Sequence, residues 1–454
     1  MKNYKLLNNL FGWISFVIAA IVYILTTESS ASFWDCSEFI SSAFKLEVGH
    51  PPGAPFFMLC ANLFTHFTSD VTMVGKMVNI FSALCSAATI LFLFWTITHL
   101  AKKIACKDGE VPSLAQTIAI LGSGMVGALA YAFSDTFWFS AVEGEVYAFS
   151  SLFTAVVFWV ILKWEEHADE PHSDRWIVLI AYLMGLSIGV HLLNLLAIPA
   201  IALVFYYKKF SHTNWKGTLM ALFASFAIVG VLMYGLIPGM VHVAGWFELF
   251  FVNTLSMPFN TGVLVYCLFV IAAVIWGVYE SGQGKNRVRA NISFMVSAIL
   301  MGAPFIGSSL VIGILLSVAL GVFLFMKKEI NYRVMNTTLL SMMVMAIGYS
   351  SYAVIIIRAS ANTPMSQNAP KDVFTLESYL NREQYGERPL LYGQTFVADV
   401  QREAQGGGCV PVYKEGGPTY ARDIKKDPNE KDKYIISGHK SIPVYQPELC
   451  MLFP

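Results

Sequence analysis

Long apolar runs separated by short polar segments fill the first 358 residues of the chain. The runs hold roughly 20 residues each, long enough for a helix to cross a bilayer and too long for a strand of a membrane barrel. The pattern therefore predicts an all-α polytopic membrane protein with about 11 transmembrane helices. The expected spans are 10–27, 72–99, 114–133, 136–162, 176–190, 192–207, 217–238, 260–279, 291–303, 305–326 and 334–357.

Two of these boundaries follow from charge. Residues 176–207 form one apolar stretch of 32 residues, which as a single helix would be roughly 48 Å long. A turn near His191 keeps the lysines that follow the stretch on the side of the other lysine-rich loops, as the positive-inside rule requires. The same argument divides 291–326 near Gly302. Eleven crossings result, with the N-terminus inside and the C-terminal end outside.

The first run, 10–27, has a cleavable signal peptide as its alternative interpretation, because Ser29-Ser30-Ala31 would supply a cleavage site. The run is long for the apolar part of a signal peptide, so we interpret it as a retained helix. In both cases the residues that follow Thr27 lie outside the cytoplasm.

The amino-acid composition also indicates a membrane protein, and it changes along the chain. Hydrophobic residues make up 56% of the 454 positions and charged residues 13%, about half the share of a soluble domain. The 30 basic residues offset 30 acidic ones, so we expect no nucleic-acid partner. From Ala359 onward polar residues replace the aliphatic ones. We therefore predict a transmembrane domain, 1–358, and a soluble extracytoplasmic tail, 359–454, as the start of a larger module.

The first outer loop carries the most informative polar residues. Asp35 and Glu38 are three positions apart, so both carboxylates lie on one face of a helical turn. In the sequence His50-Pro51-Pro52-Gly53 the prolines end any helix and the glycine permits a sharp bend. The loop thus combines an acidic turn, a histidine and a rigid corner near the outer surface. A solvated loop with an ordinary helix cap is the alternative.

A second acidic pair, Glu143 and Glu145, lies near the outer end of the fourth span. Carboxylates at membrane depth are costly and mark candidate functional sites. Residues two apart point to different sides of a helix, so at most one is expected to face a pocket. If the helix instead begins only at Val146, both carboxylates are in water.

Three more polar residues are expected at the same outer face of the membrane. His191 and Asn194 share a helix face, either in a pocket or as ordinary hydrogen bonds between helices. Arg358 is a lone cation at the end of the last span, where it either contacts a phosphate or extends toward the interface. Such a set suits a reaction at the bilayer surface, with a carboxylate base for a hydroxyl and a cation for a phosphate leaving group.

These residues carry a resemblance to a known family. Trp34-Asp35-Cys36-Ser37-Glu38-Phe39, followed by His50-Pro51-Pro52-Gly53, resembles the first-loop signature of the transmembrane protein O-mannosyltransferase-like family, glycosyltransferase family 117 of the GT-C superfamily. Glu145-Val-Tyr147 and Gly189-Val-His191-Leu-Leu-Asn194 look like later segments of that family. Tyr379-Leu-Asn-Arg-Glu-Gln-Tyr385-Gly resembles the tail of its Bacteroidetes-type members.

The resemblance implies a GT-C-like bundle that transfers a sugar, with mannose expected, from a polyprenyl-phosphate donor to Ser/Thr hydroxyls of exported proteins. It implies a bacterial inner membrane with a periplasmic tail, an inverting reaction, and no metal or other cofactor. Asp35 would be the catalytic base, and Glu38 would orient Asp35 or a substrate hydroxyl. The residues expected to bind donor or substrate are His50, Glu143, Glu145, His191, Asn194 and Arg358.

Other functions remain as alternatives. An ion-coupled transporter would place its acidic residues near the membrane midplane on broken helices of two repeated halves. In this chain the acidic residues cluster at the outer edge of the first half, and we find no internal repeat. A scaffold without catalysis would leave the acidic turn unexplained. Transfer to a lipid or glycan acceptor is a close variant that the sequence does not separate from transfer to protein.

Overall fold

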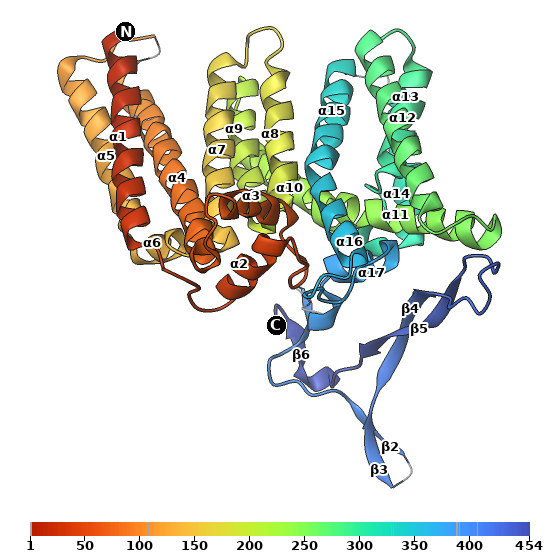
Figure 1. Ribbon diagram of the computed structural model, residues 1–454. Coiled ribbons are helices and arrows are strands. Elements are labelled where there is room, and N and C mark those ends of the chain that lie inside the picture. Colours follow the sequence, from red (N-terminus) through yellow and green to blue (C-terminus); the bar gives the residue numbers. More distant parts are fainter. Residues whose placement is uncertain are drawn as a thin grey trace.

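The computed structural model describes residues 2–454 except 108, 328, 330, 387, 388, 390 and 406, with the backbone alone for residues 2 and 3. Helices fill the described chain up to residue 380, and short strands follow. This confirms the predicted class of an all-α polytopic membrane protein. Figure 1 shows the long helices side by side, with the N-terminus at one end of the bundle and α2, α3, α6 and the tail at the other.

The helices have the following bounds: α1 Lys2–Thr26, α2 Cys36–Lys45, α3 Pro55–Thr65, α4 Val74–Ala105, α5 Leu114–Ala132, α6 Asp135–Ala141, α7 Val146–His167, α8 Asp174–Ile188, α9 Ile198–Lys209, α10 Trp215–Val231, α11 Ile237–Leu249, α12 Thr261–Gln283, α13 Arg287–Leu300, α14 Leu310–Met326, α15 Tyr332–Tyr349, α16 Ala353–Ser360 and α17 Val373–Leu380. Within the described chain, each of the eleven predicted spans overlaps a helix, and one of them, 136–162, overlaps two. Eight helical stretches are apolar and at least 18 residues long, as a crossing requires. Three others, α8, α13 and α14, have only 15, 14 and 17 residues.

One predicted span is wrong at its start. The range 136–162 was expected to be a single helix, but α6 ends at Ala141 and α7 begins only at Val146. Both glutamates of the Glu143-Gly144-Glu145 segment therefore lie in the break between the two helices. The glycine explains the close packing of this segment, because a Cβ on Gly144 would lie 2.9 Å from Val78.

The two predicted turns lie where the charge argument placed them. Between α8 and α9 the chain passes through a 3-10 turn at Leu192–Ala197, next to His191. Between α13 and α14 it leaves helical geometry around Gly302, whose φ is +76°. The predicted span 217–238 belongs to a longer helical stretch, Trp215–Thr254, whose second part, α11, runs across the other helices in Figure 1.

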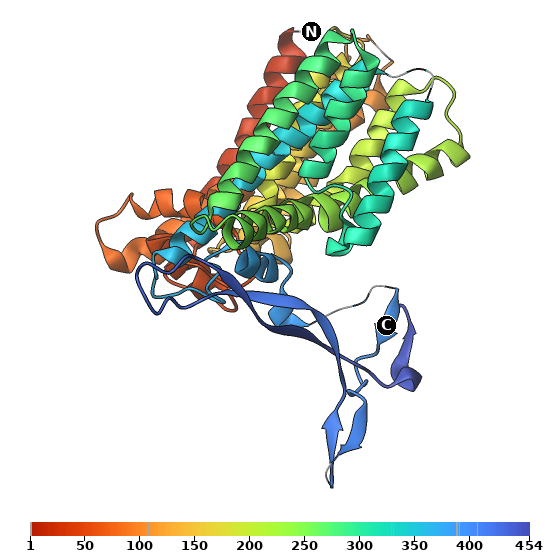
Figure 2. The same ribbon diagram turned by 90° about the vertical axis from the view of Figure 1, so that its right-hand side faces the viewer.

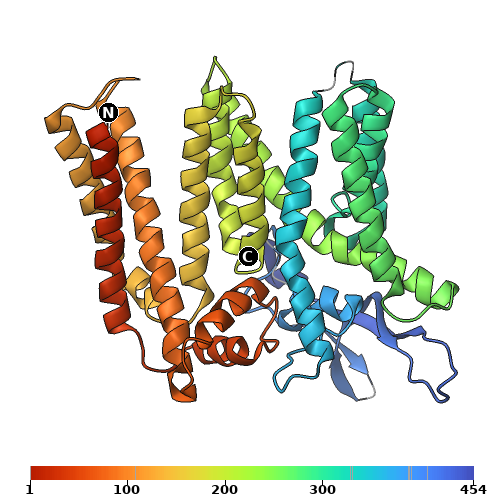
Figure 3. The ribbon, with the colours of Figure 1, turned by 45° about the horizontal axis from the view of Figure 1, so that its top comes forward.

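The helices form three groups when the bundle is viewed with its top forward (Figure 3). The central and last groups meet where α8 packs directly against α15. A Cβ on Gly185 of α8 would lie 2.5 Å from the backbone oxygen of Met345, and Gly348 of α15 is equally close to the backbone of α8. Such small residues allow two membrane helices to approach closely.

Helices α2 and α3 of the first outer loop pack on the bundle through a core of their own. Phe39 of α2 and Phe57 of α3 contact each other with ring centroids 5.5 Å apart. They continue into Phe81 of α4 and Phe149 of α7, whose centroids are 5.1 Å apart. Burying this many aromatic rings fixes the loop on the end of the bundle.

The described residues of the tail form three small antiparallel sheets of two strands each: β1 Tyr392–Gln394 with β6 Cys450–Leu452, β2 Arg402–Gln405 with β3 Gly408–Pro411, and β4 Tyr413–Arg422 with β5 Tyr434–Pro443. Figure 2 shows these sheets beyond the end of the bundle where α2 and α3 lie. The long hairpin β4–β5 is tied to the bundle at Tyr434, which exchanges backbone hydrogen bonds of 2.8 Å with the side chain of Asn253.

Candidate active site

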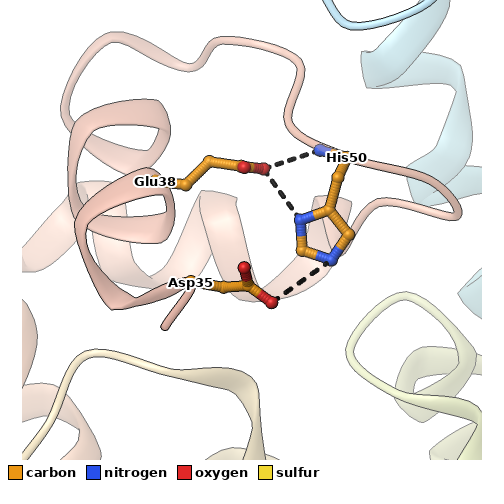
Figure 4. Close-up of side chains that lie close together, drawn as sticks. All are labelled: Asp35, Glu38 and His50. Carbon is orange, nitrogen blue, oxygen red and sulfur yellow. Dashed lines mark hydrogen bonds and ion pairs between the residues drawn. The ribbon is translucent and has the colours of Figure 1, made fainter. Parts of the chain in front are cut away.

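Asp35, Glu38 and His50 of the first outer loop come together in the structure (Figure 4). Glu38 Oε1 lies 2.9 Å from His50 Nδ1 and accepts a second hydrogen bond of 2.6 Å from the backbone N–H of His50. On the other side of the ring, His50 Nε2 lies 3.9 Å from Asp35 Oδ2. The imidazole therefore bridges the two carboxylates that the sequence placed on one helical turn.

The start of α2 explains why both carboxylates are available. Asp35 occupies the N-cap and Glu38 the third helical position, the two places whose side chains usually bond to the free N–H groups of a helix start. Asp35 makes no side-chain cap bond here, and Glu38 turns to His50. The helix thus gives up capping bonds that would stabilise it by about 1 kcal/mol.

The corner after His50 has the sharp geometry that its sequence predicts. The backbone N–H of Gly53 donates to the carbonyl of His50 over 2.8 Å, and the φ of Gly53 is +72°, which favours glycine. A Cβ on Gly49 would lie 2.5 Å from Glu38 Oε1. Any larger residue at either position would displace the groups around His50.

The tail also holds this loop in place. Gln367 donates a hydrogen bond of 3.1 Å to Glu38 Oε2. Both oxygens of the Glu38 carboxylate therefore accept hydrogen bonds. The backbone of Val48 pairs with that of residues 365–367. From α17, the fully buried Tyr379 donates to the carbonyl of Gly49 over 2.6 Å.

A pocket of about 230 Å³ opens beside the imidazole. Its polar lining comes from five segments far apart in sequence: the first loop, the break before α7, the turn before α9, the turn between α15 and α16, and the segment after α17. The titratable residues that line it are Asp35, His50, Glu145, Tyr147, His191, Tyr352 and Arg382. Acidic and basic groups thus face one space at the end of the bundle opposite the N-terminus.

Three of the residues expected to bind donor or substrate do not line this pocket. Glu143 points away and is hydrogen-bonded to Ser32. Asn194 is fully buried and accepts a hydrogen bond of 2.8 Å from Thr154. Arg358 donates to the carbonyl oxygens of Leu46 and Lys45 over 2.6 and 2.9 Å.

Glu38 and His50 influence each other's protonation. Partial burial alone would raise the pKa of Glu38, but hydrogen bonds from His50 and Gln367 outweigh it and hold the pKa below its ordinary value. The hydrogen bond to Glu38 raises the pKa of His50, against the opposing effect of burial, and the charge of Asp35 adds to the rise. Glu38 is therefore a fixed anion that favours the charged imidazolium beside Asp35.

Glu145 and His191, across the pocket, are shifted toward their neutral forms. Burial, together with the charges of Glu143 and Asp35, raises the pKa of Glu145 to about 7. Burial and the nearby charge of Arg382 lower the pKa of His191. Since His191 Nδ1 accepts the N–H of Leu193, its neutral ring carries the proton on Nε2 and can donate it.

The shifted carboxyl of Glu145 makes the stability of the fold depend on pH. Its pKa is about 7 in the folded chain against an ordinary 4.5, so ionisation costs folding free energy as pH rises through this interval. We expect Glu145→Gln, which cannot ionise, to be more stable than the intact chain by about 1–3 kcal/mol at pH 8. The difference should shrink as the pH falls toward 4.5, which thermal unfolding in detergent measures.

The exposed Glu170 provides the control for this substitution, since Glu170→Gln should give no such pH-dependent gain. Equal stability differences for Glu145→Gln at pH 5 and pH 8 would contradict the assignment of a shifted carboxyl.

Asp35, Glu38 and His50 are also the residues that could hold a cation. One ligand atom from each lies within 4.8 Å of the others. However, Glu38 Oε1 and His50 Nδ1 already form a hydrogen bond with each other, and a metal would have to replace it.

Arg382 is a charged residue of the pocket that the sequence analysis did not identify as functional. It lies in the Tyr379–Gly386 segment that resembles the family's tail, but no helix or charge pattern singled it out. Its φ is +55°, an uncommon conformation for a residue other than glycine and one that recurs at functional sites. Only the folded tail brings its guanidinium to the pocket.

Comparison with known proteins covers the first part of the site. The family model described as the protein O-mannosyl-transferase TMEM260 N-terminal domain matches residues 35–214, and a family of unknown function (DUF8416) matches residues 386–454. The first match begins at Asp35 and extends beyond His191 and Asn194, but it leaves Arg358 and Arg382 outside. No solved structure matches the chain.

Two curated relatives carry the same name. Protein O-mannosyl-transferase tmem260 of Dictyostelium discoideum is 22% identical over 230 residues, which are 48% of this chain and 26% of the relative. Protein O-mannosyl-transferase TMEM260 of Mus musculus is 27% identical over 173 residues, which are 38% of this chain and 22% of the relative. The chain thus spans about a quarter of the length of these relatives. The resemblance to a protein O-mannosyltransferase-like family, predicted from the first-loop motifs, is therefore confirmed, and it rests on residues 35–214.

Proposed function

We propose that the chain is a membrane glycosyltransferase that moves a sugar, with mannose expected, from a polyprenyl-phosphate donor to Ser/Thr hydroxyls of exported proteins. The observation that carries this proposal is the pocket in which Asp35 and Arg382 face one space. A base and a cation in one pocket are what attack by a hydroxyl on a sugar phosphate needs. The names of the two relatives support a protein as the acceptor.

The reaction assigned to this pocket is a single displacement. The acceptor oxygen forms a bond to the anomeric carbon while the bond from that carbon to the phosphate oxygen breaks. The hydroxyl proton passes to the carboxylate of Asp35, and the polyprenyl phosphate leaves with the electron pair of the broken bond. One displacement of this kind inverts the configuration of the sugar.

Asp35 suits the role of base better than Glu38 does. The Asp35 side chain is 58% exposed and makes no cap bond, so its oxygens can reach a substrate hydroxyl. The Glu38 side chain is 20% exposed, and its oxygens accept hydrogen bonds from His50 and Gln367. Glu38 is therefore assigned as a positioning residue that orients the imidazole next to Asp35.

On the donor side, we assign the leaving phosphate to Arg382 and the Nε2–H of His191. A guanidinium binds a phosphate through paired, charge-assisted hydrogen bonds, and a neutral histidine adds a third donor. Neutral Glu145 avoids repulsion of the phosphate below pH 7. Donor-binding roles for Glu143, Asn194 and Arg358, as predicted from the sequence, are the alternative to this assignment; these residues lie outside the pocket, and an Arg358 variant decides between Arg358 and Arg382 for the phosphate.

The location of the reaction follows the lysine distribution. We propose a bacterial inner membrane protein with a cytoplasmic N-terminus, which puts the pocket and the tail, 359–454, in the periplasm. This supports an exported protein as the acceptor, because exported chains and lipid-linked sugars meet on that side. We also propose that residues 1–358 form the transferase domain and that the tail contributes Gln367 and Arg382 to its site.

The test is sugar transfer by membranes that contain the chain. Labelled polyprenyl-phosphate mannose and a Ser/Thr-containing peptide are supplied, and we expect label on the peptide in amounts that follow expression of the chain. EDTA should leave the rate unchanged, because the proposed step needs no metal. Label on lipid or glycan instead of peptide would overturn the acceptor assignment, and no transfer to any acceptor would overturn the proposal.

A further inference from the structure

A second cavity, which we call the tail groove, lies next to the pocket of the candidate active site. It has a volume of about 570 Å³ and lies between α11, α17 and the hairpin β4–β5, which Figure 1 shows on the tail side of the bundle. The segment after α17 separates the two spaces, because Arg382 lines the pocket and the next residue lines the tail groove. The lining includes Trp246, Phe374, Glu377, Glu383, Tyr420 and Lys440.

Aromatic rings from three elements give the tail groove its apolar surface. Trp246 of α11 is held by Phe305, with ring centroids 4.9 Å apart. Phe374 of α17 and Tyr420 of β4 contact each other with centroids also 4.9 Å apart. The three lining rings are only partly buried, so each keeps surface that a ligand can cover. Large aromatic side chains of this kind supply much of the binding energy where a partner docks.

The edge of strand β4 forms a further part of the lining. Residues 417–420 are four consecutive positions of β4, and all four line the tail groove. Successive side chains of a strand point to opposite faces, so four consecutive lining residues indicate that the cavity follows the edge of the strand. In the described part of the chain β4 pairs with β5 alone, which leaves its other edge free. Such an edge can take up an extended peptide as an added strand.

One carboxylate oxygen of the tail groove is open to a ligand. Glu383 is already paired with Lys440. Glu377 Oε1 lies 2.8 Å from His242 Nδ1 and accepts a hydrogen bond of 3.3 Å from Ser308. Glu377 Oε2 accepts no hydrogen bond from the described residues, yet it keeps accessible surface, and the side chain is 16% exposed. A lysine or arginine side chain is the charged partner that such an oxygen fits.

We propose that the tail groove binds an extended segment of the acceptor polypeptide, beside the Ser/Thr residue that receives the sugar. The inference rests on the proposed function, which supplies that acceptor. The segment pairs with the free edge of β4, an apolar side chain contacts Trp246 and Tyr420, and a basic side chain pairs with Glu377. An extended chain advances about 3.3 Å per residue, so a few residues reach from the groove past Glu383 to the pocket of Asp35. A glycan would use the rings and the carboxylate but not the strand edge.

Filling the tail groove tests this inference without removing a contact of the fold. A Cβ on Gly417 would have no neighbour within 4 Å, so Gly417→Phe adds a ring beside the edge of β4. Gly408→Phe makes the same exchange at an exposed position of β3 outside the lining, where a Cβ is equally free of close contacts. The two variants therefore differ in whether the new ring occupies the groove.

Peptide binding to the full chain in detergent, without donor, is the first measurement. The probe is a labelled peptide of about nine residues, with one threonine flanked on both sides by leucine and lysine. Gly417→Phe should weaken its binding at least about ten-fold, and Gly408→Phe should leave it within about two-fold. Unchanged binding in Gly417→Phe, or equal losses in both variants, would overturn the inference.

Two competitors on the intact chain keep the test decisive if a variant does not fold. The same peptide with glutamate in place of each lysine should bind about ten-fold more weakly, because it places like charge at Glu377. Equal binding of the two peptides would overturn the inference. Displacement of the lysine peptide by a soluble mannose oligosaccharide would also overturn it, since the groove would then hold a glycan.

Transfer assays separate failure of this inference from failure of the proposed function. Gly417→Phe should raise the KM for the peptide at least about ten-fold and leave the KM for the donor unchanged. Transfer to N-acetyl-threonine amide, which is too short to reach the groove, should match that of the intact chain. An unchanged peptide KM in Gly417→Phe would overturn the groove and leave the proposed function standing. Peptide binding that Gly417→Phe blocks, without sugar transfer to any acceptor, would support the groove and overturn the proposed function.

Discussion

Asp35→Asn is expected to slow sugar transfer by about 10²- to 10⁴-fold, the usual contribution of a general base, while donor binding persists. Asparagine has the size of aspartate but lacks the basic oxygen. Because the Asp35 side chain makes no cap bond, the substitution leaves α2 and its packing in place. The loss should therefore appear in kcat, measured as label transferred per unit of chain in membranes with expression matched by blotting.

Two further variants decide what the loss means. Asp70→Asn makes the same exchange at an exposed helix cap on the same side of the bundle, where asparagine also caps well, so transfer should be unchanged. Glu38→Gln should cost less than Asp35→Asn, because Glu38 acts through His50. If Asp35→Asn keeps near-normal transfer and Glu38→Gln abolishes it, the two assignments are reversed. If both remain active, the first loop is not the catalytic site.

The part of the fold that the sequence predicts well is the part governed by hydrophobic length and lysine distribution. Those two features place a helix in every predicted span and locate the turns at His191 and Gly302. They fail at 136–162, because the residues of the break, Glu143-Gly144-Glu145, are too few to interrupt an apolar pattern. What opens the helix there is tertiary: Gly144 packs closely on α4, and Glu143 bonds to Ser32.

The candidate site, like the fold, was predictable from the sequence only in part. Asp35, Glu38 and His50 are close in sequence, and the sequence predicted two carboxylates on one helical turn with a histidine in the same loop. That the imidazole lies between the two carboxylates is seen only in the structure. Arg382 is brought to the pocket by a contact that no local pattern contains, the hydrogen bond from Tyr379 to the carbonyl of Gly49, which joins positions 330 residues apart. Conversely, Arg358 looks unpaired in the sequence, yet its guanidinium donates to two backbone carbonyls at the end of α2.

The second large expected effect concerns donor binding by Arg382, the arginine that lines the pocket. Arg382→Ala should weaken binding of the polyprenyl-phosphate donor by about 10- to 100-fold, which corresponds to the 1.5–3 kcal/mol of hydrogen bonds to a charged group. Arg382→Lys should recover part of the loss, because lysine keeps the charge but not the paired geometry. Binding of a labelled short-chain donor to the purified chain measures both.

Arg402→Ala is the matched control, because Arg402 is an exposed arginine of the same tail that lies outside the pocket lining. It should leave donor binding unchanged, and a loss equal to that of Arg382→Ala would mean that the tail acts through its general charge.

Arg358→Ala distinguishes the two assignments of the phosphate contact. It removes hydrogen bonds to Lys45 and Leu46, so we expect it to lower the thermal stability of the chain more than its donor affinity. A strong loss of donor affinity in Arg358→Ala, with none in Arg382→Ala, would contradict this assignment. Arg358, at the end of the last span, would then be the phosphate contact, as predicted from the sequence alone.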